Sequence, residues 1–113
     1  MEGHDWIKQF PASIMVCDCN GVILDMNDKA ARTYESYGAY ALIGKNLLDC
    51  HPEPARNKVE KQLAACEKNI YTIAKDGVKK LIYQSPWFKD GAYAGLVEIS
   101  LEIPFEMEHF IRS

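Results

Sequence analysis

The sequence lacks any apolar run of the roughly 18–20 residues that a helix needs to cross a bilayer. Its N-terminal residues, MEGHDWIKQF, also lack the basic-then-apolar layout of a signal peptide. No internal repeat and no low-complexity tract interrupts the chain. These absences predict a cytoplasmic protein with no membrane contact.

An excess of basic charge is also missing, because 13 Lys and Arg residues stand against 16 Asp and Glu residues, for a formal net charge of −3. The basic residues are scattered among acidic ones, whereas nucleic-acid-binding domains concentrate them on one face. We therefore predict no nucleic-acid partner. With 113 residues, 48% of them hydrophobic, the chain is long enough for one domain with a core of its own.

Two runs rich in β-branched residues flank Asn20-Gly21 within residues 13–26. An Asn-Gly pair tolerates positive φ, so this pattern predicts a β-hairpin. Three later runs, over residues 70–74, 78–88 and 93–103, alternate or end in Gly-containing turns and predict antiparallel strands. Pro86 cannot donate to a ladder and predicts an edge, an end or a bulge. In the last run we expect a buried face that comprises Val97, Ile99, Leu101 and Ile103.

Between the hairpin and these strands the period is helical. Asn27 and Asp28 supply capping oxygens for a helix over about residues 28–36. Short turns hinged at Gly44 follow, and Pro52 and Pro54 predict the start of a longer helix over residues 53–68. Residues 2–10 predict a further short helix, which Pro11 ends. The apolar positions of the longer helix are Ala55, Val59, Leu63 and Cys66.

This order of elements resembles a PAS domain, and five short motifs support the resemblance. They are the hairpin Val16-Cys17-Asp18-Cys19-Asn20-Gly21-Val22-Ile23, Asn27 at the first helix, Leu42-Ile43-Gly44-Lys45-Asn46, Ser85-Pro86, and Gly95-Leu96-Val97-Glu98-Ile99-Ser100. The resemblance implies an α+β, PAS-like (profilin-like) fold with a five-stranded antiparallel sheet. It places the helices between the second and third strands, where they cover one face.

The resemblance covers residues 11–103, which leaves an N-terminal helical cap over residues 1–10 and a short tail over residues 104–113. It implies a non-enzymatic sensory module in bacterial signal transduction or transcription regulation. Where signalling relatives often end in Asp-Ile-Thr, this chain has Leu101-Glu102-Ile103-Pro104. If the chain that begins at Met1 is complete, any signal must pass by association with a partner protein.

The resemblance also indicates whether the chain could bind either of two cofactors, flavin and haem. Flavin photosensors of the class carry a reactive Cys where this chain has Leu47, so we predict no flavin. Haem sensors usually carry an axial His on the longer helix, and here only His51 lies near it, so we predict no haem. No Cys-x-x-Cys-His sequence for covalent haem occurs either.

The cysteines allow two further chemistries. Cys17 and Cys19 share a strand face and, with Cys50 and His51, could complete a zinc set, although structural sites favour wider spacing. Cys50 beside His51 could also serve a small enzyme, which we rank last because sequence neighbours rarely face each other productively. Two disulfides are possible among the four cysteines, which include Cys66, but cytosolic thiols stay reduced. We expect free cysteines, no metal and no catalysis.

The sequence favours a small-ligand pocket instead, held between the helical segment and the sheet. Concave ligand sites are mostly apolar with a few fixed polar groups. The predicted lining is Leu47, Leu48, Val59, Leu63, Tyr83, Ser85, Trp87, Val97 and Ile99. The alternative is a purely structural dimerisation or scaffold domain whose core is filled.

Both ends of the chain carry apolar residues beyond the needs of the sheet. Exposed apolar patches usually mark association sites, and PAS domains often dimerise through the N-terminal helix and the outer sheet face. We therefore predict a homodimer, with the interface residues Trp6, Ile7, Phe10, Phe105 and Phe110.

Overall fold

A computed structural model describes residues 5–113 and leaves out the side chain of Cys50. The helices are α1 (Asp5–Lys8), α2 (Asp28–Thr33) and α3 (Ala55–Ala65), with the 3-10 helices η1 (Glu35–Tyr37), η2 (Ala39–Leu42) and η3 (Leu47–Cys50). The strands are β1 (Ser13–Asp18), β2 (Ile23–Met26), β3 (Asn69–Lys75), β4 (Val78–Lys89) and β5 (Ala92–Ile103).

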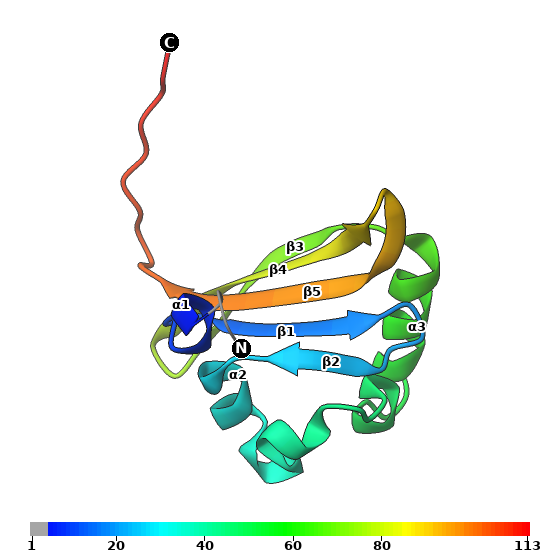
Figure 1. The fold of residues 1–113 in the computed structure, drawn as a ribbon. Coiled ribbons are helices and arrows are strands. Elements are labelled where there is room, and N and C mark those ends of the chain that lie inside the picture. The colour runs from blue at the N-terminus through cyan, green and yellow to red at the C-terminus, as the bar shows by residue number, and fades with distance from the viewer. Residues whose placement is uncertain (1–4) are drawn as a thin grey trace.

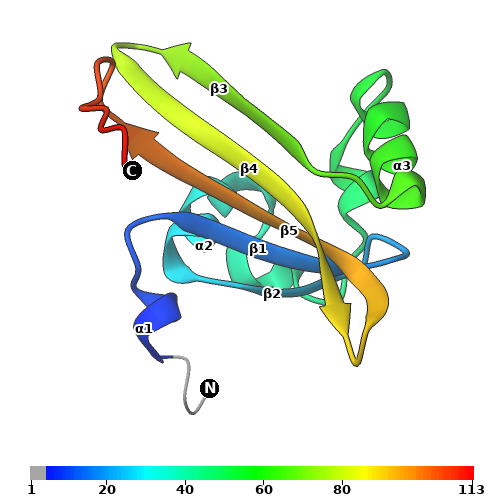
Figure 2. The same cartoon turned by 90° about the horizontal axis from the view of Figure 1, so that it is seen from above.

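The strands form one five-stranded antiparallel sheet in the order β2-β1-β5-β4-β3. Figure 1 shows the helical segment between β2 and β3 gathered along the β2 side and one end of the sheet. In the view from above, α3 stands beside β3 and β4, and α1 lies near the start of β1 (Figure 2). The predicted fold class, with helices between the second and third strands, is confirmed.

The first hairpin forms where the sequence predicts it, but its connection is wider than a two-residue turn. The Asp18 carboxylate accepts hydrogen bonds from the backbone N–H groups of Asn20 and Val22, each at 2.9 Å. Gly21 adopts a φ of +88°, which suits glycine. The Val22 carbonyl accepts from the Asp18 N–H of β1 at 2.9 Å, and Val22 also forms a β-bridge with Asn46, so this hairpin is tied to the helical segment.

The helices are shorter than their sequence patterns predict. The helix predicted over residues 28–36 ends at Thr33 and is followed by η1. The longer helix predicted over residues 53–68 starts only after Pro54 and ends at Cys66, which adopts a left-handed φ of 56°. Helix ends commonly fray into such turns because their last carbonyls lack intrahelical partners.

The core lies between β1, β2 and β5 on one side and the helical segment on the other. Its buried residues are Cys17, Ile23, Met26, Ala30, Ala31, Leu42, Leu47, Leu63 and Leu96. Leu63 is the buried residue of α3, whereas Val59 is only half-buried against the core. Small residues at positions 30 and 31 let α2 approach the sheet closely.

The two faces of the sheet are assigned by the strand register. One row across the strands pairs Asn69 with Gln84, Gln84 with Glu98, and Glu98 with Met15. The adjacent row pairs Ile70, Tyr83, Ile99 and Ile14 in the same order, and its side chains point to the opposite face. We call the face of Met15 and Glu98 the inner face, because Cys17 and Leu96 of the core share it, and the other the outer face.

The predicted burial of β5 is therefore wrong. Leu96 is the buried apolar residue of this strand, while Val97, Ile99, Leu101 and Ile103 lie half-buried on the outer face. The physical reason is that both faces of β5 are partly covered, so alternation alone does not show which face meets the helices. Pro86 lies in the part of β4 that extends beyond β3, next to a bulge, as predicted for an edge or a bulge.

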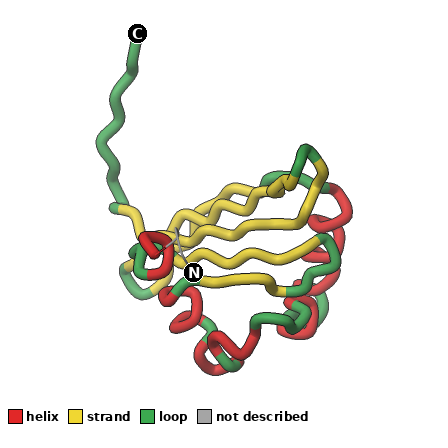
Figure 3. The backbone as a smooth tube through the Cα atoms, in the orientation of Figure 1, coloured by secondary structure: helices red, strands yellow, loops and turns green. Residues whose placement is uncertain are grey.

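The edge strand β3 and the C-terminal residues are exposed. Every residue of β3 is exposed, and this strand has a neighbour on one side only. The C-terminal residues 104–113 are exposed and extend away from the sheet (Figures 1 and 3). Among the helices of residues 5–113, none combines the length and the apolar character of a membrane span.

Candidate functional site

A cavity of about 520 Å³ lies between α3, η3 and the inner face of the sheet. Met15, Cys17 and Leu96 of the sheet and Leu47 and Val59 of the helical segment supply its apolar lining. The polar and charged lining residues are His51, Lys58, Lys61, Gln62, Glu67, Lys68, Asn69, Tyr71, Gln84 and Glu98. The cavity thus has an apolar end on β1 and β5 and a polar wall on β3, β4 and β5.

The polar wall is an ordered chain of hydrogen bonds. The Asn69 Nδ2 donates to the Gln84 Oε1 at 3.1 Å, and the Gln84 Nε2 donates to the Glu98 Oε1 at 3.1 Å. These three residues are direct cross-strand neighbours, so the register of β3, β4 and β5 places them in one row. The row orients the Glu98 carboxylate at the cavity.

Burial and the Glu98 charge affect two neighbouring side chains. The pKa of Tyr71 is raised by partial burial and then by the negative charge of Glu98. The pKa of the buried Cys17 thiol is raised mainly by desolvation, so this thiol stays protonated at neutral pH. Both groups are therefore neutral, and Glu98 supplies the negative charge of this wall.

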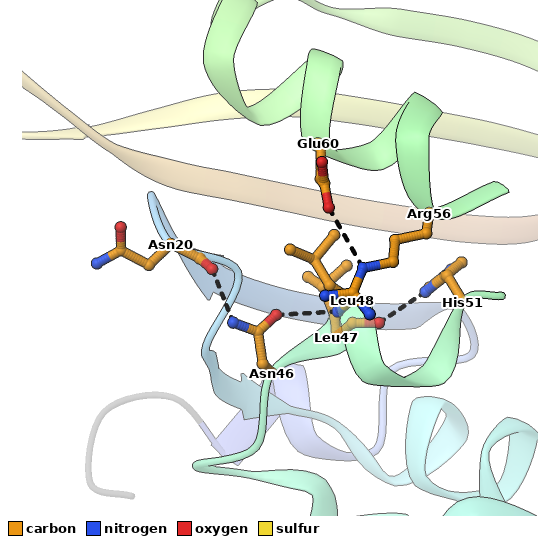
Figure 4. Close-up of polar contacts among 7 residues, drawn as sticks. All are labelled: Asn20, Asn46, Leu47, Leu48, His51, Arg56 and Glu60. Carbon is orange, nitrogen blue, oxygen red and sulfur yellow. Dashed lines mark hydrogen bonds and ion pairs between the residues drawn. The ribbon is translucent and has the colours of Figure 1, made fainter. Parts of the chain in front are cut away.

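The η3 turn is held against the first hairpin by backbone and amide contacts. The Asn46 Oδ1 accepts from the Leu48 N–H at 2.9 Å, and the Asn46 Nδ2 donates to the Asn20 carbonyl at 2.9 Å (Figure 4). The Leu47 N–H donates to the Gly21 carbonyl at 2.8 Å. These bonds place the Leu47 side chain in the core and at the cavity.

His51 ends η3 and lines the cavity. Its Nδ1 lies 2.7 Å from the Leu47 carbonyl oxygen (Figure 4). A carbonyl can only accept, so Nδ1 carries the proton in this contact and Nε2 is the nitrogen left for other partners. On the adjacent surface of α3, Arg56 pairs with Glu60 at 3.2 Å, an exposed pair of small energetic value.

The predicted pocket residues divide into three groups. Leu47 and Val59 line the cavity, and Val97 borders it although its position in β5 puts its side chain on the outer face. Leu63 is buried in the core, and Leu48 lines a second cavity of about 530 Å³ between η3 and the start of α3. Tyr83, Ser85, Trp87 and Ile99 lie on the outer face, so we correct their predicted place on the cavity wall.

The correction has a simple physical origin. Charged and amide side chains such as Glu98 and Gln84 are usually solvent-exposed, so the sequence pattern places the apolar residues of the last strand on its buried face instead. The structure turns Glu98 and Gln84 toward the cavity. Trp87, in contrast, donates from Nε1 to the Cys17 carbonyl at 3.0 Å across the strand ends. The signal that was missed is that three successive strands each carry a polar residue, Asn69, Gln84 and Glu98, at positions that pair with one another across the sheet.

The predicted interface residues are mostly exposed. Trp6 is 67% exposed, Phe10 47%, Phe105 57% and Phe110 65%, while Ile7 is half-buried beside β1. Trp6 and Ile7 belong to α1, and the two C-terminal aromatics lie in the extended tail. In Figures 1 and 2, α1 lies near the start of β1, and the tail leaves the sheet from the end of β5.

The structure describes three of the four cysteine side chains. Within residues 5–113, no described cluster of three His, Cys, Asp or Glu side chains is suited to hold a metal ion. Cys17, Cys19 and Cys66 are free. The Cys50 side chain lies outside the described part of the structure, so its pairing with His51 stays a prediction.

The fold and the cavity together define a class: an α+β domain in which a helical segment encloses a side cavity on an antiparallel sheet. The sequence profile of the PAS fold family matches residues 7–69. The chain belongs to the PAS family, as its motifs predict. Domains of this family are generally sensory modules rather than catalysts.

Solved structures show the same fold at low sequence identity. The PAS domain of BvgS from Bordetella pertussis is 22% identical, has a TM-score of 0.65, and covers 87% of this chain and 81% of its own. The PAS domain of an HTR-like protein from Haloarcula marismortui is 17% identical, with a TM-score of 0.61 and coverages of 87% and 86%.

A third similar structure is the Aer2 receptor from Vibrio cholerae, described as a dual PAS-haem oxygen sensor. It is 18% identical, has a TM-score of 0.56, and the match covers 82% of this chain and 95% of that one. No curated protein matches the sequence.

Proposed function

We propose that the chain is a PAS-type sensory module that binds a small molecule in the cavity under α3 and has no catalytic step of its own. The observation that carries the proposal is the cavity of about 520 Å³ with an apolar end and one ordered polar wall. Small-molecule sites combine apolar linings with a few fixed polar groups in this way. A scaffold with a filled core would have no use for such a space.

The mechanism that fits this site is a shift between two arrangements of the helical segment. A ligand that binds one arrangement better biases the chain toward it. Gly44 suits the hinge, because its φ of +93° is a glycine conformation and no atom crowds the space beside it. The change would reach a signalling partner protein or a transcription regulator through the sheet.

We propose that the resident ligand is neither flavin nor haem. The position of the reactive flavin thiol is Leu47, whose side chain packs in the core and cannot form an adduct. The imidazole that a haem would use, His51, lies at the end of η3 rather than on α3. Visible absorbance from the purified protein would contradict this proposal.

The expected result for the purified chain is a native mass that exceeds its denatured mass by one small molecule. The cavity exposes apolar surface that a ligand would remove from water, which favours retention during purification. Native and denaturing mass spectrometry of the same sample measure the difference. Identical masses, in samples from several purifications, would support the scaffold alternative instead.

We also propose that two copies associate through the outer face and the chain ends. The outer row carries apolar side chains from four strands, namely Ile14, Ile70, Tyr83 and Ile99, and exposed apolar surface of this kind marks association sites. The exposed Trp6 and Phe10 before β1, and Phe105 and Phe110 after β5, add apolar side chains at the chain ends. A two-fold dimer uses such a patch twice.

The variant Ile99→Glu tests the association, because a carboxylate at the centre of the outer face would be desolvated at an interface. We expect the dimer to dissociate at least about tenfold more readily, as for an unpaired charge at an interface. The control is Ala64→Glu, which adds the same charge to an exposed position of α3. Sedimentation equilibrium measures both. A monomeric wild-type chain, or equal dimerisation of the two variants, would contradict the proposal.

A further inference from the structure

We propose that the cavity selects a small organic cation, such as an amine or an amidinium, whose charged head pairs with the carboxylate of Glu98. This inference rests on the proposed ligand-binding function and adds the chemical class of the ligand. It is carried by the direction of the hydrogen-bond chain, the placement of the charges and the apolar end of the cavity.

The direction of the hydrogen-bond chain follows from the chemistry of Glu98, its last residue. An ionised carboxylate only accepts hydrogen bonds, so Gln84 must present its NH₂ group to Glu98. The Gln84 carbonyl is then left to accept from the Asn69 NH₂ group. The hydrogen-bond chain provides a single donor to Glu98, although a carboxylate offers about four lone-pair positions. Acceptor capacity therefore remains at the cavity wall.

The charges around the cavity differ in how firmly they are placed. Glu98 lies on a central strand, half-buried, and is held by Gln84. The other charged lining residues, Lys58, Lys61, Glu67 and Lys68, are exposed. Long exposed side chains keep their charged groups in water, where salt screens them. A fixed and partly desolvated carboxylate discriminates between ligand charges better than mobile surface ammonium groups do.

The other end of the cavity is apolar. Met15 and Leu96 of the sheet and Leu47 of η3 supply this lining. A ligand that removes such apolar surface from water gains binding free energy. The site therefore favours a cationic head on an aromatic or apolar body.

The test compares three probes that share one ring and differ in charge: benzamidine, benzamide and benzoate. Amide chemical shifts of the isotope-labelled full chain report the affinity of each at up to millimolar concentration. We expect benzamidine to bind at least about tenfold more tightly than benzoate, as for one charge-assisted hydrogen bond. Its largest shifts should fall on Gln84 and Glu98.

The variant Glu98→Gln keeps the shape of the side chain and removes the charge, and we expect it to reduce benzamidine affinity at least about tenfold. The control Glu102→Gln makes the same change four residues along β5, at an exposed position away from the cavity lining. It should leave the affinity unchanged.

The class of ligand would be overturned by benzoate binding as tightly as benzamidine, by no binding of benzamidine, or by full affinity in Glu98→Gln. The comparison of probes on the wild-type chain needs no variant, so a folding defect in Glu98→Gln does not remove the test. A small molecule found by native mass alongside any of these outcomes would leave the sensory function standing and reject only the cation.

Discussion

Replacing Asn27 with alanine is expected to lower the free energy of unfolding by about 3 kcal/mol, as for several lost bonds at a buried polar residue. Asn27 is 2% exposed. Its Oδ1 accepts from the Ile14 and Ala30 N–H groups at 3.0 and 3.1 Å, and the second of these bonds caps α2. One side chain therefore joins β1 to the first helix after the hairpin.

The amide nitrogen of Asn27 also donates hydrogen bonds, to carbonyl oxygens of the N-terminal segment. It donates to the carbonyl oxygens of Ala12 at 2.7 Å, Ile7 at 3.1 Å and Phe10 at 3.5 Å. These carbonyls belong to the segment from α1 to the start of β1, so Asn27 anchors the N-terminal segment to the sheet. Asn27→Asp retains the accepting oxygen but places a carboxylate against three carbonyls, and it should destabilise at least as much.

The matched control is Asn46→Ala, which removes another helix-capping amide. Asn46 is half-buried and makes two hydrogen bonds, one of them to the Leu48 N–H of η3. Its loss should cost about 1 kcal/mol, the usual value for a cap. Urea unfolding of the three variants, followed by circular dichroism, measures the difference. Equal losses for Asn27→Ala and Asn46→Ala would refute the anchoring role of Asn27.

The second large effect is expected at Gly95, where the variant Gly95→Ala should lose about 3 kcal/mol or more of stability through strain and overlap. The φ of Gly95 is +144°, a region that residues with a Cβ atom rarely adopt. A Cβ at this position would overlap the carbonyl oxygen of Cys17 and lie 2.7 Å from the Asp18 Cα. Because these are backbone atoms of β1, neither can move aside without breaking the β1–β5 ladder.

Gly91 provides the control, since it lies in the turn between β4 and β5 and also has a positive φ, +82°. No atom lies within 4 Å of a Cβ built there. Gly91→Ala should therefore cost only the intrinsic strain of the left-handed conformation, about 1 kcal/mol. Thermal unfolding separates the two variants. A loss at Gly95 no larger than at Gly91 would show that β1 accommodates the added methyl group.

Local chemistry explains which parts of this fold could be predicted from the sequence. Asn20-Gly21 marks the first hairpin, and Pro54 marks the start of α3 within two residues of the predicted position, because turn and proline preferences act over a few residues. The turns at Gly77 and Gly91 both have positive φ, as glycine allows. These signals required no knowledge of distant contacts.

The cavity could not be predicted as well, because it depends on which strand faces meet the helices. The bulge between Val16 and Cys17 shifts the β1–β2 pairing, and no local pattern marks it, whereas Pro86 marks the bulge between Trp87 and Phe88. Glu98 and Gln84 read as solvent-facing residues, although they line the cavity. The prediction for the helical segment was better: Val59, predicted from the apolar spacing of the longer helix, and Leu47, predicted in the turns before it, both line the cavity.

The exposure of β3 has a consequence for how a ligand would enter. An edge strand with one neighbour and no buried residue opens at low free energy, and amide exchange in such strands is fast compared with central strands. Asn69 and Tyr71 of this strand belong to the cavity wall. The wall of the cavity on β1 and β5 is therefore more rigid than the wall on β3. Local opening of β3 would let a ligand enter while β5 keeps Glu98 in place.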